Sequence, residues 1–180
     1  MHESSHMPRY GFDIDGTLFS VGLILQRFGE ITGRHVTFST MTAYSFADDF
    51  GLSRQEEYDI FSRIKSDVNL HSKPLQRTVS LAKAYKGQGC EVDIITARRQ
   101  SALSDTQAAL GNAGIPYDHL FMDAHDKEQV IRSRHLDRYF DDQGALIEAL
   151  MDSDVSSFCG LTLVDAPYNH GYRCHSRLYV

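Results

Sequence analysis

Two aspartates two positions apart, Asp13 and Asp15, are the residues of this sequence best suited to chemistry. They lie in the segment Phe12–Leu18, which follows a β-rich start and contains Gly16. Residues two apart on a strand face the same way, so both carboxylates can project from one strand end, where Gly16 permits a sharp turn. One carboxylate could attack phosphorus to form an acyl phosphate. The other could protonate the leaving oxygen and later activate water.

Thr96 and Lys127 offer groups that could bind a phosphoryl oxygen. Thr96 comes directly after an apolar run, where its hydroxyl and the free N–H groups of a following helix can donate hydrogen bonds. Thr96 could equally be a plain helix N-cap. Lys127 is the only lysine after Lys86, and its ammonium could offset negative charge beside an attacking carboxylate. Its alternative interpretation is a surface lysine.

An acidic pair, Asp141 and Asp142, follows Tyr139 and Phe140. Mg²⁺ prefers hard oxygen ligands. Asp13, the carbonyl of Asp15 and one or both residues of the pair could supply them, and we favour Asp141 slightly as the direct ligand. Exposed turn acids are the alternative interpretation of the pair.

The elements that must position these groups alternate along the chain. We expect strands over 9–14, 91–95, 119–122, 138–140 and 161–164, and helices over 21–31, 53–68, 75–86, 101–113, 127–134 and 145–151. Strands that alternate with helices indicate an α/β fold with a mostly parallel sheet. In such sheets ligands bind beyond the carboxyl ends of the strands, which is where the candidate residues stand.

Together these motifs, in this order, resemble the haloacid dehalogenase-like (HAD) superfamily, whose pattern is DxDGT, then Ser/Thr, then Lys, then an acidic pair. The resemblance implies a Rossmann-like three-layer sandwich and a Mg²⁺-dependent phosphatase. Asp13 would be the nucleophile, Asp15 the general acid/base, and Thr96 and Lys127 their catalytic partners. The expected substrate-binding residues near the phosphoryl group are Gly16, Thr17, Ala97 and Arg98.

A narrower resemblance is to the 5′(3′)-deoxyribonucleotidase branch. It rests on segments 95–98, 114–118 and 165–169, on the acidic pair, and more loosely on segments 44–46 and 50–53. It implies a nucleoside monophosphate as substrate. Thr17 departs from this branch, whose animal members usually carry valine there.

Residues 20–73 lie between the first two motifs, where the family places a helical cap. We therefore expect a core of 9–19 and 74–180, the cap, and a disordered or tag-like segment over 1–8. Tyr44, Phe46 and Phe50 could stack on a base, although cap aromatics are more often core residues. Arg34 or His35 could contact a polar part of the substrate.

Composition limits the remaining possibilities. The chain of 180 residues is 42% hydrophobic with a formal net charge of −6, which disfavours an extended nucleic-acid surface. No apolar run is long enough for a membrane helix. The three cysteines are odd in number and form no close metal-type pair, so we expect free thiols in a reducing cytoplasm. We expect a monomer or a homodimer. The alternatives are a sugar-phosphate phosphatase, a polynucleotide-end phosphatase, or a non-catalytic relative that has kept the fold.

Overall fold

The structure is a computed structural model that describes residues 7–180. Residues 1–6, most of the segment that we expected to be disordered or tag-like, lie outside the described residues. Pro8 belongs to the folded part, because its carbonyl oxygen accepts a hydrogen bond from the N–H of Glu91 at 2.9 Å. Within residues 7–180, no helix is both long and apolar enough to cross a membrane.

A six-stranded sheet in the order β3-β2-β1-β4-β5-β6 forms the centre of the molecule, and every strand pair is parallel. The strands are β1 (Arg9–Phe12), β2 (Glu91–Ile95), β3 (His119–Phe121), β4 (Arg138–Asp141), β5 (Gly160–Val164) and β6 (Ser176–Leu178). The expected parallel α/β sheet is confirmed. The strand order reverses between β1 and β4, the point at which doubly wound sheets bind ligands.

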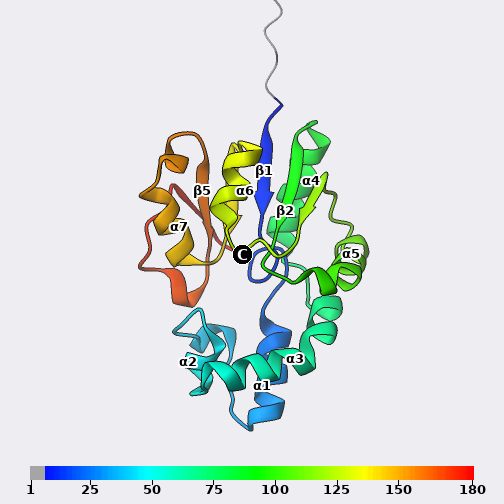
Figure 1. The fold of residues 1–180 in the computed structure, drawn as a ribbon, viewed down its shortest axis with the longest axis vertical. Helices are drawn as coiled ribbons and strands as arrows, with labels where there is room; N and C mark the ends of the chain where they lie inside the picture. Colours follow the sequence, from blue (N-terminus) through cyan, green and yellow to red (C-terminus); the bar gives the residue numbers. More distant parts are fainter. Residues whose placement is uncertain (1–6) are drawn as a thin grey trace, which may run out of the picture.

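Helices cover both faces of the sheet and make three layers (Figure 1). Neighbouring strand residues supply both interfaces, because successive side chains point to opposite faces. Ile94 and Phe140 pack on the side of α4 and α5, whereas Ile95 and Tyr139 pack on the side of α6 and α7. These helices are α4 (Gln76–Gly87), α5 (Leu103–Asn112), α6 (Lys127–Arg134) and α7 (Gly144–Met151), with short 3-10 turns η2 (Gln100–Ala102), η3 (Asp154–Ser157) and η4 (Pro167–Asn169).

The segment between β1 and α4 forms a helical unit below the carboxyl end of β1 (Figure 1). It contains α1 (Gly22–Thr32), the turn η1 (Phe38–Thr40), α2 (Phe46–Phe50) and α3 (Arg54–His71). Ser53 starts α3 with a capping box: its hydroxyl accepts from the N–H of Glu56, whose carboxylate accepts from the N–H of Ser53. The unit has its own apolar core around the fully buried Phe28.

The two ends of this helical unit lie side by side. The N–H of Ser20 donates to the carbonyl of Lys73 at 2.8 Å, and the N–H of Leu75 donates to the carbonyl of Leu18 at 2.8 Å. These contacts stand at the limits of the expected 20–73 insertion. The unit also contacts the core through α3, where the hydroxyl of Ser66 donates to the carboxylate of Asp105 in α5.

Several elements differ from the expected ranges. Strand β1 ends at Phe12, so Asp13 and Ile14 already belong to the turn that follows it. The helix expected over 101–113 begins as the 3-10 turn η2 and becomes α-helical only at Leu103. Strand β6 was not expected, because a three-residue, half-buried Ser-Arg-Leu segment carries no strand pattern of its own.

Candidate active site

The ammonium group of Lys127 connects two aspartates at the carboxyl ends of β1 and β4. Its Nζ lies 2.7 Å from Oδ1 of Asp13 and 2.8 Å from Oδ2 of Asp141. Lys127 is the first residue of α6, whose N-cap Asp126 accepts from the N–H of Gln129. All three charged side chains are buried, so the two ion pairs act with little screening by water.

A third buried carboxylate, that of Asp142, makes this cluster electrostatically unbalanced. Burial raises the pKa of Asp13 to about 7, and repulsion from Asp141 and Asp15 adds to the effect while Lys127 opposes it. Burial and the charges of Asp141 and Asp13 likewise raise the pKa of Asp142. Burial disfavours the ammonium of Lys127, but the two bound carboxylates outweigh it and raise its pKa. Lys127 therefore stays charged, and the three carboxylates, when all are deprotonated, carry more negative charge than this one cation balances.

This donor set fits a hard divalent cation. One oxygen each from Asp13, Asp141 and Asp142 lies within 4.8 Å of the others. Both oxygens of Asp141 already accept hydrogen bonds, from Lys127 and Tyr139 on one side and from the N–H of Gln143 on the other. In contrast, Oδ1 of Asp142 is buried and has no hydrogen-bond partner among residues 7–180. An unpaired buried carboxylate oxygen is costly, so Asp142, rather than the slightly favoured Asp141, is the better direct ligand.

Gly16 allows the turn after β1 to pass close to Asp142. Its φ of +80° lies in the left-handed region, and a Cβ placed there would be 2.1 Å from Oδ2 of Asp142. The turn after β1 thus requires glycine at position 16. The hydroxyl of the neighbouring Thr17 is buried and has no hydrogen-bond partner in the described part of the chain.

Thr96 directly follows β2 and lines the same cavity as Asp13 and Lys127. Its hydroxyl accepts a hydrogen bond from the N–H of Arg98 at 3.1 Å, so part of its bonding capacity serves the local turn. A cavity of about 570 Å³ is bounded by these residues together with Ala97 and His125. His125, which sequence reasoning did not single out, carries no motif signal and reaches this cavity only through the loop before α6.

Arg98 lines the same cavity as Asp13 and Lys127, and its guanidinium is bound there to a carboxylate. Its guanidinium donates to both carboxylate oxygens of Asp15, at 2.6 Å and 2.9 Å. Its Nη1 also reaches the carbonyl of Asn69 and the hydroxyl of Thr106. In this arrangement Arg98 holds Asp15 rather than presenting free donors to a phosphoryl group.

A second cavity of about 530 Å³, here called the aromatic cavity, opens between the helical unit and the core. Tyr44 and Phe46, the two expected base-stacking residues, both line it. Its aromatic lining also includes three side chains outside our expectations: Tyr58, Phe61 and Tyr168.

Three further residues of the cap segment lie elsewhere. Phe50 is only 1% exposed and packs against Phe28 in the core of the helical unit, so it cannot stack on a ligand. Arg34 donates to the carbonyl of Gly51 and, with His35, lines other hollows of the helical unit. Phe50 is thus a core residue of the helical unit, and Arg34 and His35 do not line the aromatic cavity.

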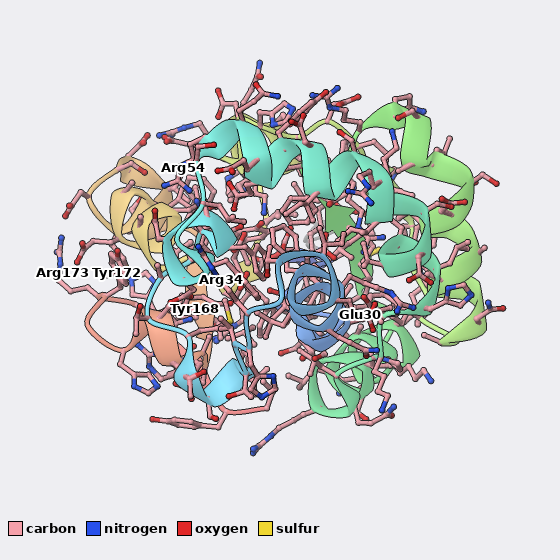
Figure 2. All side chains as sticks on the ribbon, turned by 90° about the horizontal axis from the view of Figure 1, so that it is seen from below. Glu30, Arg34, Arg54, Tyr168, Tyr172 and Arg173 are labelled. Carbon is pink, nitrogen blue, oxygen red and sulfur yellow. The ribbon has the colours of Figure 1, made fainter. Side chains whose placement is uncertain are left out.

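Tyr168 links the acidic cluster to the helical unit. Its hydroxyl donates to Oδ2 of Asp142, and its ring meets the edge of Tyr44 with 5.9 Å between centroids. Seen from the side of the helical unit, Tyr168 lies close to the segment that leads into α2 (Figure 2). The adjacent Asn169 is fully buried and donates to the carbonyls of Asp142 and Val164. The sequence marked this segment only as part of a resemblance, since its contact with Asp142 depends on tertiary packing.

No family model matches the sequence. A protein of Halalkalibacterium halodurans named "Putative nucleotidase" is 24% identical over 162 residues, which cover 89% of this chain and 81% of that protein. Among solved structures, a predicted phosphatase from Clostridium acetobutylicum gives a TM-score of 0.67 at 11% identity, covering 98% of this chain and 95% of that one. A HAD family hydrolase from Deinococcus radiodurans, solved with bound phosphate and sodium, gives 0.61 at 12% identity, covering 97% and 91%. The chain therefore has the fold of HAD hydrolases, and the expected three-layer architecture is confirmed.

Proposed function

We propose that this protein is a Mg²⁺-dependent phosphomonoester hydrolase that carries the phosphoryl group on Asp13 during its reaction. The observation that carries the proposal is the position of Lys127 between Asp13 and Asp141, beside the unpaired oxygen of Asp142. A solvated surface carboxylate would not need a buried cation beside it. A carboxylate nucleophile that must approach a dianionic phosphate needs such a cation, because the cation offsets the repulsion between them.

In the first half-reaction, Asp13 attacks the phosphorus atom and the bond from phosphorus to the ester oxygen breaks. Lys127 holds Oδ1 of Asp13, which leaves Oδ2 without a hydrogen-bond partner within residues 7–180. The leaving oxygen takes a proton from the carboxyl group of Asp15. Asp15 must give up one of its two bonds to Arg98 to do so. The hydroxyl of Thr96, which lines the same cavity as Asp13, is a donor available to phosphoryl oxygens.

In the second half-reaction, water attacks the phosphorus of the acyl phosphate and the bond to Asp13 breaks. Asp15, now a carboxylate, accepts the proton of that water, and inorganic phosphate leaves. The cycle returns both aspartates to their starting states. No other reactant is consumed.

The residues that would hold Mg²⁺ are Asp13, Asp142 and the carbonyl of Asp15. When bound, the cation would supply positive charge that offsets the carboxylates and the phosphoryl oxygens. Asp141 would act mainly by orienting Lys127, because both of its oxygens are already hydrogen-bonded.

We propose a nucleoside monophosphate as the substrate class. The aromatic cavity begins at Asp15 and Asp142 and is lined by rings of Tyr44, Phe46 and Tyr168. Aromatic rings favour a planar base over a polyhydroxyl sugar. The nucleotidase name of the Halalkalibacterium halodurans relative supports the same choice. We further propose that residues 20–73 act as a cap that covers the leaving group and excludes water.

Phosphate release from a panel of esters tests this function. The panel contains deoxyribo- and ribonucleoside 5′- and 3′-monophosphates, sugar phosphates and an aryl phosphate, each with Mg²⁺ and with chelator. We expect nucleoside monophosphates to be preferred, and both chelator and Asp13→Asn to lower turnover by at least about a thousandfold. Turnover confined to sugar phosphates would overturn the substrate but not the mechanism. Full activity of Asp13→Asn would overturn the mechanism.

A further inference from the structure

A second hollow meets the aromatic cavity at Asp15. It has a volume of about 420 Å³ and is here called the basic cavity. Both cavities share four lining residues: Asp15, Ile24, Tyr58 and Phe61. A leaving group that is attached to a phosphoryl group at Asp13 and passes Asp15 therefore has two directions open to it.

The two cavities differ in charge. The aromatic cavity contains one cation, Arg54, which already pairs with Asp48 and Glu57. The polar residues of the basic cavity other than Asp15 carry hydroxyl, amide or cationic groups: Ser62, Lys65, Asn69, Arg98, Arg99 and Ser101. Its single carboxylate, Asp15, is neutralised by Arg98. The basic cavity is thus rich in hydrogen-bond donors and carries excess positive charge.

Lys65 and Arg99 are the source of that excess. Within residues 7–180 neither forms an ion pair with a carboxylate, although the protein has a net charge of −6 and most of its arginines are paired. Lys65 extends from the same face of α3 as Tyr58, Phe61 and Ser62, as helical spacing dictates. The guanidinium of Arg99 lies over the ring of Tyr58, 5.6 Å from its centroid. Two unpaired cations from opposite sides of the cleft therefore face one space.

We propose that the preferred substrate carries a second phosphate on its leaving group, and that Lys65 and Arg99 bind it. The inference rests on the proposed phosphatase function and narrows it. The base would enter the aromatic cavity and the second phosphate the basic cavity, as in a nucleoside 3′,5′-bisphosphate. The 5′-phosphorylated end of a dinucleotide presents the same chemistry through its internucleotide phosphate. The competing explanation is that the two cations only attract the scissile phosphate from a distance.

The test compares Lys65→Gln/Arg99→Gln with the wild-type protein. Substrates are a deoxyribonucleoside 5′-monophosphate, its 3′,5′-bisphosphate and a 5′-phosphorylated dinucleotide. Arg63→Gln is the matched control, because Arg63 is an exposed cation of the same helix that lines neither cavity and forms no ion pair among residues 7–180. We expect the wild-type kcat/KM to favour the doubly phosphorylated substrates about tenfold, as two exposed ion pairs allow, and the double variant to abolish that ratio. Arg63→Gln should keep the wild-type ratio.

A binding measurement separates this proposal from the proposed function. In the Asp13→Asn background, calorimetric titration with the monophosphate and with the bisphosphate gives the ratio of the two binding affinities without turnover. Preferential binding of the bisphosphate that disappears in the double variant supports the second site even if no ester is hydrolysed. Equal affinity for both ligands, or an equal loss for both in the double variant, overturns it. A preference for the dinucleotide over the bisphosphate would identify polynucleotide ends as the source of the second phosphate.

Discussion

The guanidinium of Arg98 grips Asp15 at both carboxylate oxygens, with Nη2 2.6 Å from Oδ1 and Nε 2.9 Å from Oδ2. Arg98 is nearly buried, whereas Asp15 remains partly exposed at the junction of the aromatic cavity and the basic cavity. Two-point pairing fixes the orientation of a carboxylate more strictly than a single bond does. Arg98 thus determines where the proposed acid/base waits before a substrate arrives.

Replacing Asp15 with asparagine should separate the two half-reactions. Nucleoside monophosphates have a poor leaving group, so their turnover should fall about 10²- to 10⁴-fold without an acid. The aryloxide of an aryl phosphate leaves without protonation, so this substrate should still phosphorylate Asp13. Asp15→Asn should then give a burst of phenolate followed by slow turnover, measured by stopped-flow absorbance. Asp105→Asn is the control, because Asp105 is near Arg98 but lines neither substrate cavity. Equal losses on both substrates, with no burst, would contradict the role of Asp15.

Lys127→Met should destabilise the metal-free protein. The change leaves Asp13 and Asp141 buried without their shared cation. Breaking a buried ion pair in this way lowers the free energy of unfolding by about 3–5 kcal/mol. Urea unfolding in chelator measures this loss, and Mg²⁺ should reduce it because it brings positive charge to the same carboxylates. Lys86→Met provides the comparison, since its partner Asp118 is near the surface. A loss below about 1 kcal/mol in chelator would show that the buried ion pairs contribute little.

Mg²⁺ should stabilise the protein more at pH 8 than at pH 5.5. Without metal, burial raises the pKa of Asp13 to about 7, above its value in the unfolded chain, so stability is lost as pH rises towards and through 7. The cation binds the deprotonated carboxylate, so protons compete with it below pH 7. The increase in Tm on adding Mg²⁺, followed by differential scanning fluorimetry across this range, reports both effects. A shift independent of pH would contradict the assignment of Asp13 as a ligand.

Tyr168→Phe should lower the affinity for Mg²⁺ about tenfold. This is the lower end of the loss that follows when a side chain that hydrogen-bonds a metal ligand is removed. The variant removes the hydroxyl that orients Asp142 but keeps the ring that faces Tyr44. Isothermal titration with Mg²⁺ gives the affinity directly, without any turnover. Tyr58→Phe removes a hydroxyl from the same aromatic cavity without touching Asp142, and its Mg²⁺ affinity should match the wild type. Equal affinities of all three proteins would show that Tyr168 only lines the cavity.

The sequence by itself determined the parallel α/β fold and the places of Asp13, Thr96 and Asp141. Each follows an apolar strand segment, and the carboxyl ends of parallel strands must meet at one edge of the sheet. The helix range of α6 could be predicted residue by residue, with Lys127 at its start. Such features depend on local periodicity and on a topology with few alternatives, so one sequence suffices to predict them.

Tertiary structure alone decided which groups are paired and which are free. Arg98 turns to Asp15, Tyr168 reaches Asp142, and Phe50 is enclosed in the core of the helical unit. These outcomes depend on loop conformation and side-chain rotamers, which no local pattern encodes. For the same reason the unpaired oxygen of Asp142 and the unpaired charge of Lys65 became visible only in the folded chain. A residue's partner is set by all the segments that pack around it, whereas its place at a strand end is set by its immediate neighbours.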